Sequence, residues 1–379
     1  MRANLRNPVT PWDHIQAYRR ELTEMDERAL RALQAAYYRS TGQMYEELQL
    51  ITRKIEQALR DGTPVHPNWL WRQERWQSLM HQASESMHHY GIEARSIIEA
   101  HEMASGIKGA KDAAGLLQVV SPGTTFNMLP IEAVEMMVAN LRIQAPAGQL
   151  LNEIAQTAPR MLRETIMYDL ENELVGGIAL GRNPRDVARR IHKRVGDKVE
   201  NLSYHRAETI ARTESLRMYR AAANENYRAN SNVVKGWVWV SELNQNTCAG
   251  CLGMHMTTHP VDKNLESHVG CRCAAMPFVD DERPDLPFGD DWLRDQPESV
   301  QRRILDSPTR YQLWKDGKIT LADCVEEGRH RVWGGTIGTR RIRDLKRVAA
   351  GELPSKPNPV WNPLGDPVVT PTPTPTPAA

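Results

Sequence analysis

Four of the five cysteines in this chain lie in one short stretch, as Cys248-Ala-Gly-Cys251 and Cys271-Arg-Cys273. A Cys-x-x-Cys turn directs two sulfurs toward one point, and residues two apart in a strand share a face. The intervening segment is long enough for the chain to return, so both pairs can meet. The fold is therefore expected to contain a small module that is closed by its thiols.

This spacing favours a metal site, because two converging thiolate pairs are the usual ligands of structural zinc. We expect one structural zinc ion, with the fourth ligand open between Cys273 and His268. The candidate metal ligands are Cys248, Cys251, Cys271, Cys273 and His268. His255 and His259 are weaker substitutes.

A redox pair or a structural disulfide fits this pattern less well than a metal site. A redox Cys-x-x-Cys usually lies between a strand and a helix in a βαβ context, and no such pattern flanks this pair. Structural disulfides need an oxidising compartment, whereas the first residues, MRANLRNPVTPWDH, contain no apolar signal segment. Residues 244–273 contain almost no Ile, Phe or Trp, and a structural zinc ion supplies of order 10 kcal/mol to small domains.

No enzymatic constellation accompanies the cysteines. A zinc ion with four protein ligands has no vacancy for a substrate. His101-Glu102 begins a HExxH-like run, but Ser105 stands where the second histidine would be. The chain also lacks the glycine-rich and nucleophile-elbow motifs of nucleotide-binding proteins and hydrolases. We therefore expect a protein that is not an enzyme.

The periodicity predicts a mainly helical fold with a small β module. Apolar residues recur every three or four positions from Ile15 to Ala36, from Met44 to Leu59, and through most of the chain up to residue 229. The glycine-rich segment Gly106–Gly123 predicts a loop. The β-branched and aromatic segments 233–240 and 274–280 predict strands.

These patterns divide the chain into five parts. Beyond Pro287 the pattern returns to helix, and the proline-rich end cannot bury enough apolar area to fold. The expected parts are a helical N-terminal region (1–125), a helical core (126–230), a zinc-stapled β module (231–285), a helical C-terminal region (286–350) and a disordered Pro/Thr tail (351–379).

Charge gives two local candidates for nucleic-acid contact. The net charge is +1, so no overall field attracts the chain to DNA, and no stretch has the length and apolarity of a membrane span. Basic residues nevertheless gather at 182–198 and 329–347. Each cluster is either a solvated face or a phosphate-binding surface. The candidate contacts are Arg185, Arg189, Lys193, Arg340, Arg341 and Arg343.

Residues 203–229 are expected to form one helix with a narrow face of Ala207, Ala211, Met218 and Ala222. Glu214 falls on that face and needs a partner such as Arg217 or an arginine of another helix. Glu208 and Arg212 have the spacing of a surface ion pair.

Taken in order, these segments resemble a known family. The segments GGIALGRNPRDVARRI, AETIARTESLRMYRAAANENY, KGWVWVSELNQNTCAGC and HVGCRC together resemble the head-morphogenesis or minor capsid proteins of tailed bacteriophages, the Mu F-like group. The resemblance covers about residues 150–280. The matching positions are Arg212, Thr213, Glu214, Trp239, Thr247, Cys248, Cys251, His268, Cys271, Arg272 and Cys273, among which Arg212, Glu214 and Trp239 are assigned structural roles.

Two departures from the family pattern concern the module. The family often has Asp at or near the position of Asn246, and a His-Pro-Asn run before Cys-Arg-Cys. This chain has His268-Val269-Gly270 instead, which puts a tight proline turn in doubt but keeps the histidine.

The resemblance implies a structural protein of the virion, assembled in the host cytoplasm and lying inside the head near the portal. The implied partners are the portal protein, with the scaffold or major capsid protein and double-stranded DNA as further candidates, and no membrane. The alternatives are a zinc-containing nucleic-acid-binding protein and a nuclease or toxin-like effector delivered with the genome. An effector would need an acid/base cluster after residue 286, where Asp, Arg and His are only scattered.

Overall fold

The computed structural model describes residues 10–62, 74–144, 173, 183–330 and 334–363. The expectation of a mainly helical fold with a small β module is confirmed. The chain forms two compact units. The helical unit comprises residues 23–104 and 140–215, and the sheet unit comprises residues 1–22, 105–139 and 216–379.

The long helices are α1 (Pro11–Arg60), α3 (Glu74–Val120), α7 (Pro184–Leu202) and α8 (Tyr204–Ala229). The two apolar runs expected near the N-terminus belong to one helix, α1, because Gly42 between them does not end it. Asn183 caps α7 as expected, and its side chain accepts a hydrogen bond from the Arg185 amide at 2.9 Å.

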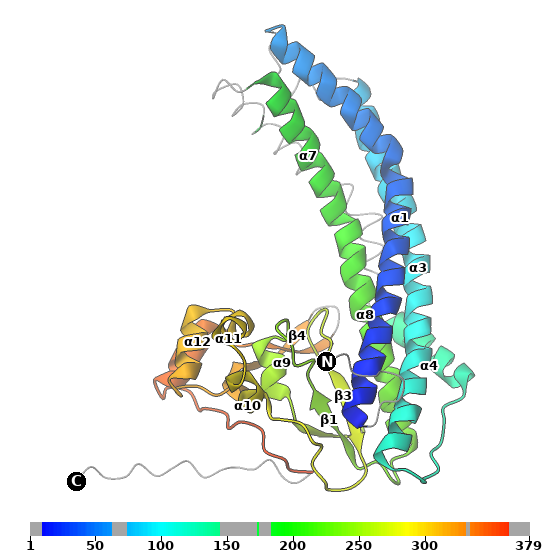
Figure 1. The fold of residues 1–379 in the computed structure, drawn as a ribbon. Helices are drawn as coiled ribbons and strands as arrows, with labels where there is room; N and C mark the ends of the chain where they lie inside the picture. Colours follow the sequence, from blue (N-terminus) through cyan, green and yellow to red (C-terminus); the bar gives the residue numbers. More distant parts are fainter. Residues whose placement is uncertain (1–9, 63–73, 145–172, 174–182, 331–333, 364–379) are drawn as a thin grey trace, which may run out of the picture. The chain divides into compact units, whose positions relative to one another are not determined.

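Within the helical unit, α1, α3 and α7 run side by side (Figure 1). The side chains of Met44, Leu48 and Ile55 on α1 are fully buried. The ring of Tyr37 packs edge-on against Tyr90 of α3 with centroids 5.7 Å apart. Burial of these spaced apolar residues stabilises helices that would be marginal alone.

The glycine-rich segment at Gly106–Gly123 differs from the sequence-based expectation of a loop. Most of it is helical, as the second half of α3. A Cβ atom at Gly109 would lie 2.1 Å from the Tyr219 carbonyl oxygen, and one at Gly106 would lie 2.5 Å from Val138. The glycines therefore let α3 approach α8 and α4 (Ile131–Gln144) closely within the sheet unit.

The sheet unit contains a three-stranded antiparallel sheet in the order β2-β1-β3, with bounds Thr258–Pro260, Gly236–Val240 and Ala274–Phe278. The expected strands match β1 and β3, while the three-residue strand β2 was not expected. Every residue of β1 is buried. Trp237 and Trp239 pack in one core with Leu117 of α3 and Tyr227 of α8, so these helices supply apolar area that the module's own sequence lacks.

The C-terminal region contains a β hairpin where the sequence pattern predicts only helix. After α10 (Gly289–Arg294), α11 (Glu298–Leu305), α12 (Pro308–Lys315) and the short η1 (Ala322–Cys324), strand β4 (Val325–His330) pairs with β5 (Gly334–Thr339), and α13 (Ile342–Ala349) follows. The sequence GGTIGT of β5 has weak strand propensity. Its tertiary contacts therefore decide its conformation.

Helix α9 (Ala249–Met254) carries the first cysteine pair and packs against this C-terminal region. A Cβ atom at Gly250 would lie 2.1 Å from the Gly338 carbonyl oxygen of β5. One at Gly253 would lie 2.3 Å from the Leu321 carbonyl oxygen. Both positions therefore need glycine, because the backbone of another segment lies directly against them. Through these contacts α9 joins the cysteine module to the hairpin.

Residues 351–363, assigned to the disordered tail by sequence, lie along the sheet unit instead. The buried carboxylate of Asp323 accepts hydrogen bonds from Ser355 Oγ at 2.7 Å and from the Lys356 amide at 2.6 Å. The Trp361 ring packs edge-on against Phe278 of β3, with centroids 5.5 Å apart. These side chains anchor a proline-rich segment that has no helix or strand, and the expected tail beyond residue 363 lies outside the described residues.

Among the described residues, none of the helices is both long and apolar enough to pass through a membrane.

Candidate metal centre

The first cysteine pair is built on the start of α9. Cys248 is the N-cap residue of this helix, and its Sγ atom accepts a hydrogen bond from the Cys251 amide at 3.3 Å. The N-terminal amides of the helix point toward this sulfur, and they stabilise a negative charge on it. The cap thus favours the thiolate, the form in which cysteine binds metals.

The second part of the site is a tight turn from His268 to Cys271. The Cys271 amide donates to the His268 carbonyl oxygen at 3.2 Å, and Gly270 has φ +69°. Glycine adopts this left-handed conformation without strain. The tight turn that the sequence left in doubt is therefore formed with glycine, and it holds His268 beside Cys271.

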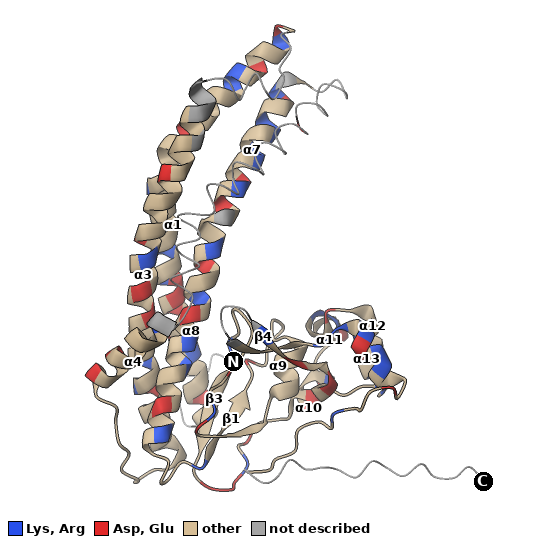
Figure 2. Cartoon of the chain, turned by 180° about the vertical axis from the view of Figure 1, so that it is seen from behind, with Lys and Arg blue, Asp and Glu red and all other residues tan. Residues whose placement is uncertain are grey.

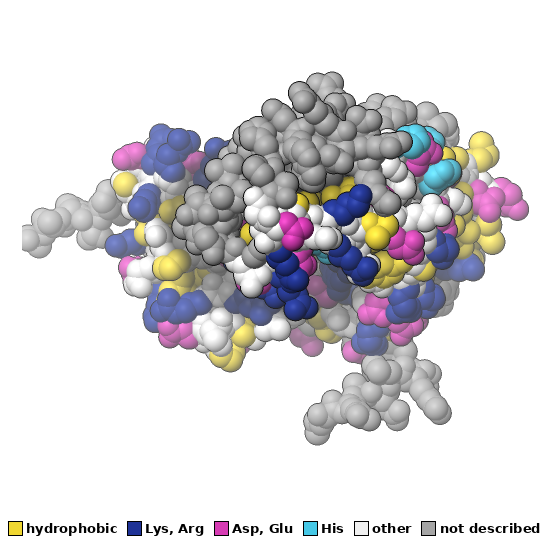
Figure 3. Space-filling model, turned by 90° about the horizontal axis from the view of Figure 1, so that it is seen from above, with side chains coloured by type: hydrophobic (Ala, Val, Ile, Leu, Met, Phe, Trp, Pro, Cys, Tyr) yellow, Lys and Arg dark blue, Asp and Glu magenta, His cyan; other side chains and the backbone are white. Residues whose placement is uncertain are grey.

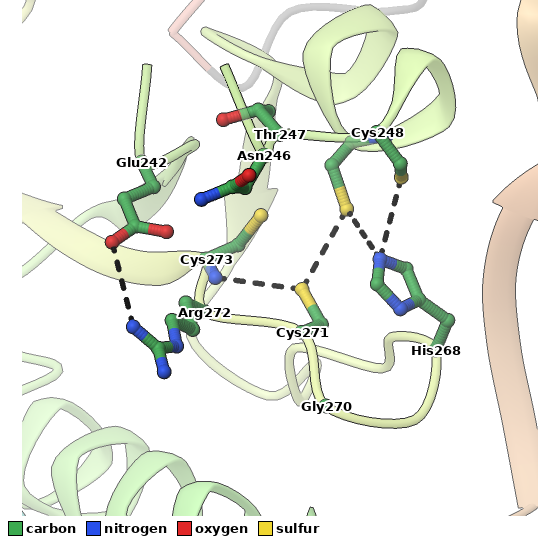
Figure 4. Close-up of a pocket in the computed structure, with 10 residues that line it drawn as sticks. Glu242, Asn246, Thr247, Cys248, His268, Gly270, Cys271, Arg272 and Cys273 are labelled. Carbon is green, nitrogen blue, oxygen red and sulfur yellow. Dashed lines mark hydrogen bonds and ion pairs between the residues drawn. The ribbon is translucent and has the colours of Figure 1, made fainter. Parts of the chain in front are cut away.

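The two parts meet at a cluster of sulfur and nitrogen atoms (Figure 4). His268 Nε2 lies 3.3 Å from Cys248 Sγ and 3.2 Å from Cys251 Sγ. The Sγ atoms of Cys251 and Cys271 are 3.6 Å apart, too far for a disulfide, and the five cysteines are free thiols.

The histidine is oriented by its own backbone. His268 Nδ1 lies 2.9 Å from the Val269 carbonyl oxygen. Because a carbonyl oxygen can only accept, Nδ1 carries the proton and Nε2 presents its lone pair to the thiols when the ring is neutral. This is the usual arrangement of a metal-binding histidine, whose second nitrogen donates to a carbonyl or carboxylate.

Within the cluster, the pKa of Cys248 is lowered and that of His268 is raised. Hydrogen bonding with Cys251 lowers the pKa of Cys248 to about 4, against the effect of burial and with further help from His268. Hydrogen bonding with Cys248 and Cys271 raises the pKa of His268 to about 11. Without a metal, the cluster is thus a thiolate beside an imidazolium, and a bound cation would take the place of that proton.

Arg220 supports the second cysteine pair directly, and a second arginine, Arg19, binds the neighbouring strand β1. Arg220 of α8 donates from Nε to the Cys273 carbonyl oxygen at 3.0 Å and from Nη2 to that of Cys271. Arg19 of α1 donates to the Val240 carbonyl oxygen at 2.8 Å. Burial lowers the pKa of Arg19, while nearby Cys273 and Glu242 oppose that shift. Sequence reasoning missed both arginines, because each lies far along the chain from its partner.

The cluster opens into a cavity of about 250 Å³ whose wall also includes polar side chains. Figure 4 shows Arg272 paired with Glu242, with their charged groups 4.0 Å apart. The remaining cavity residues are Asn246, Thr247, Cys248, Cys251, His268, Gly270, Cys271 and Cys273. Of the described residues that line this cavity, the cysteines, His268 and the paired Glu242 are those of a zinc-ligand type.

The weaker candidates, His255 and His259, are used elsewhere, and so is the fifth cysteine, Cys324. Buried His255 accepts a hydrogen bond from the Ser241 amide through Nδ1 at 3.0 Å, and burial lowers its pKa to about 4. The His259 ring stacks on Trp237 with centroids 4.2 Å apart. Cys324 lies in the separate core of the C-terminal helices, where burial raises its pKa to about 12. These three are structural side chains.

The donor set fits a soft or borderline divalent cation. The donor atoms of Cys248, Cys251 and His268 lie within 4.8 Å of one another, as do those of Cys251, Cys271 and Cys273. Thiolate and imidazole groups select zinc over magnesium or calcium, which prefer oxygen ligands. All five ligands expected from the sequence therefore come together, and the arrangement could hold a metal ion.

The three positions expected to be structural are placed as follows. Arg212 on α8 pairs with Glu208 at 3.1 Å, the ion pair expected from their spacing. Glu214 is fully buried, as its place on the alanine-lined face indicated. Trp239 is 2 % exposed within β1, in the core beside the cysteine module.

The first basic cluster lies along α7. Arg185 and Arg189 line a groove of about 360 Å³ together with Arg53 of α1. Arg189 pairs with Asp186 at 3.0 Å and Lys193 pairs with Asp197 at 2.7 Å. Figure 2 shows acidic residues among the basic ones on this helix, so neighbouring carboxylates offset much of its charge.

The second basic cluster follows the hairpin. The Arg340 amide donates to the Cys324 carbonyl oxygen at 2.8 Å, and Arg341 is the N-cap residue of α13. Exposed Arg343 lies 3.5 Å from Asp344. Over the face of the molecule drawn in Figure 3, which labels no individual residue, basic and acidic side chains lie side by side. In the described part of this cluster, Asp344 pairs with Arg343 and Arg347, which offsets part of its positive charge.

Residues 168–276 match a protein family described as phage Mu protein F like protein. The chain carries a phage Mu F-like region. In the described residues, the Mu F-like region contains α7, α8, the sheet up to Met276 and every donor of the metal cluster. This match confirms the resemblance drawn from the sequence and supports a phage head-morphogenesis family. No curated protein and no solved structure matches this chain.

Proposed function

We propose that this protein is a minor structural component of a tailed-phage head, which binds the portal protein during procapsid assembly and has no enzymatic activity. The observation that carries the proposal is the Mu F-like region, which contains the whole thiol and imidazole cluster. A bound zinc ion would supply cross-linking of two turns rather than reactivity. The protein stays inside the head near the portal.

The cluster supports a structural role for the metal. Its donor groups come from the N-cap of α9 and from the turn before β3, two segments that are distant in sequence. The candidate ligands are thiols and an imidazole. The Cys251 amide donates to Cys248 Sγ, and His268 Nδ1 donates to the Val269 carbonyl oxygen, so both groups are held in place. Such fixed, sulfur-rich sites hold folds together.

Three large apolar side chains that are close in sequence in the sheet unit are exposed and suit a protein partner. Met128 and Met136 are 66 % and 67 % exposed, and Ile131 at the start of α4 is 49 % exposed. Exposed large apolar side chains are candidates for protein-protein contacts, and methionine adapts to varied partner shapes. We assign these three side chains to contact with the portal protein.

The test is co-purification of the full chain with portal protein, with scaffold and major capsid proteins in parallel. The wild-type chain is expected to retain portal protein, and the triple variant Met128→Ser, Ile131→Ser, Met136→Ser is expected to lose at least about 90 % of it, since interface cores dominate binding. Ile92→Ser, at a side chain 57 % exposed in the helical unit, is the control. Failure of the wild-type chain to retain portal protein would overturn the assignment.

Contact with packaged DNA is a second candidate function. It rests on the groove where Arg53, Arg185 and Arg189 gather from α1 and α7. Each phosphate contact steepens the salt dependence of binding by about 0.9 in log–log slope. Substituting all three arginines by Gln should therefore reduce the slope by about 3. An unchanged slope would remove this groove from the DNA-binding surface, and the variant Arg343→Gln tests the second cluster in the same assay.

A further inference from the structure

The cluster contains one more donor than a structural zinc ion takes. Zinc in structural sites is four-coordinate, whereas the cluster offers four thiols and one imidazole, in two groups of three that share Cys251. The sequence leaves the choice between Cys273 and His268 open. The contacts made by these two side chains decide it.

His268 is prepared to be a ligand. Its Nε2 atom faces the sulfurs of Cys248 and Cys251 at 3.3 and 3.2 Å. Its Nδ1 proton is donated to the Val269 carbonyl oxygen, which fixes the ring and leaves Nε2 for a cation. The turn through Gly270 holds the ring in this place.

The sulfurs of Cys248 and Cys271 are prepared in a similar way. Each accepts a hydrogen bond from a backbone amide two or three residues ahead, from Cys251 at 3.3 Å and from Cys273 at 3.4 Å. Amide donors of this kind stabilise thiolate ligands. Cys273 thus contributes to the site through its backbone amide, which donates a hydrogen bond to the sulfur of Cys271.

The thiol of Cys273 has a different partner. It donates to Ser241 Oγ at 3.8 Å, and Ser241 Oγ in turn donates to the Cys251 carbonyl oxygen at 2.6 Å. Figure 4 shows the Cys273 sulfur on the opposite side of Cys271 from His268. Its sulfur is still within 4.8 Å of those of Cys251 and Cys271, so the contact with Ser241 rather than distance separates it from the ligands.

We propose that Cys248, Cys251, His268 and Cys271 hold one zinc ion and that Cys273 remains a protonated thiol outside the ligand set. Cys273 is a positioning residue, which supports the α9 knuckle through Ser241. This inference rests on the proposal that the cluster binds a metal, and it is independent of the portal contact.

Metal content and affinity measured on the full chain test the ligand set. The wild-type chain is expected to carry one zinc ion. The variants Cys248→Ser, Cys251→Ser, Cys271→Ser and His268→Ala should each lose more than about 100-fold in affinity against a competing chelator, beyond what outer-shell changes cost. Cys273→Ser should lose at most about tenfold. Cys324→Ser, at a buried thiol outside the cluster, is the matched control.

Cobalt substitution keeps the test decisive if a variant folds poorly. The thiolate-to-cobalt absorption of Cys273→Ser should equal that of the wild-type chain, since both have three thiolate ligands. His268→Cys should bind cobalt with stronger absorption, because a fourth thiolate joins. An unchanged spectrum in His268→Cys, together with loss of metal in Cys273→Ser, would show a four-sulfur site and overturn the inference.

Two further outcomes overturn it in distinguishable ways. Two ions per chain would indicate a pair of metals sharing Cys251, with Cys273 as a ligand of the second ion. A wild-type chain that takes up neither zinc nor cobalt would refute the metal site itself, while leaving the portal co-purification result untouched.

Discussion

The Nε2 atom of His268 lies 3.2 Å from the Sγ atom of Cys251, although the two residues are 17 positions apart in the chain. The contact joins the helical knuckle of α9 to the turn that precedes β3. These two segments have few large apolar side chains, so this polar contact is an important link between them. Whatever stabilises this contact therefore stabilises the whole module.

Removing the proposed zinc ion should loosen the module and the hairpin packed on it. Structural zinc contributes of order 10 kcal/mol in small isolated domains. We expect chelation, or Cys248→Ser with Cys251→Ser, to raise amide hydrogen exchange in residues 235–280 and in β4 and β5, since Gly250 contacts Gly338. Exchange along α7 is the internal control. Unchanged exchange in residues 235–280 after complete metal removal would contradict this prediction.

Gly109→Ala should destabilise the sheet unit. The new Cβ atom would lie 2.1 Å from the backbone carbonyl oxygen of Tyr219, which cannot move aside as a side chain can. Overpacking of this kind costs about 1–3 kcal/mol. Gly42→Ala is the matched control, because that helical glycine has nothing within 4 Å of its Cβ position and should gain up to about 1 kcal/mol. Denaturant unfolding of both variants measures the difference, and equal effects would be inconsistent with close helix approach.

Glu102 should make the stability of the helical unit depend on pH. Burial raises its pKa from 4.5 to about 7, although Arg142 donates to its carboxylate at 2.7 Å. The folded state thus holds a proton that the unfolded state releases, and stability falls as pH rises from 4.5 to 7. At about 1.36 kcal/mol per pH unit the loss is about 3 kcal/mol.

The variant Glu102→Gln isolates this dependence, because its amide oxygen still accepts from Arg142 and never ionises. Relative to the wild-type chain, the variant should gain about 3 kcal/mol between about pH 4.5 and 7 and nothing further above about pH 8. Thermal or denaturant unfolding at a series of pH values provides the measurement. Parallel pH profiles for the two chains would show that Glu102 does not titrate in this range.

Trp361→Ala should weaken the attachment of the C-terminal segment. Its ring packs against Phe278, and its indole Nε1 donates to the Asp281 carbonyl oxygen at 2.8 Å. Loss of this aromatic pair and hydrogen bond should cost about 1–2 kcal/mol. Val360→Ala, at a neighbouring side chain that is 55 % exposed, is the control. Limited proteolysis of residues 351–363 reports the effect, and equal cleavage of both variants would argue against the anchoring role.

Local signals predicted the elements whose residues determine their own conformation. Asn183 and Pro184 mark the start of α7, and the run from Gly236 to Val240 marks β1. The cysteine spacing likewise predicted which side chains meet. These signals work because caps, strand patterns and ligand spacing involve neighbouring residues.

Other features depend on contacts distant in sequence, which local patterns do not contain. Gly109 lies in a glycine-rich segment that predicts a loop. Its role in close helix packing becomes evident only from its contact with the Tyr219 carbonyl, which is distant in sequence. Strand β5 and the segment containing Trp361 are held by partners far away in the chain. Arg220 supports the Cys271 and Cys273 carbonyls from more than fifty residues away. A composition-based prediction has no access to such pairs.

The approach of Gly250 to Gly338 crosses the edge of the Mu F-like region. Gly250 lies inside residues 168–276, but the carbonyl that excludes a side chain there lies outside them. We expect homologues that keep this hairpin to carry glycine at this position, and those with another C-terminal domain to tolerate larger residues. The amino acid at this one position would then indicate the architecture that follows the shared segment.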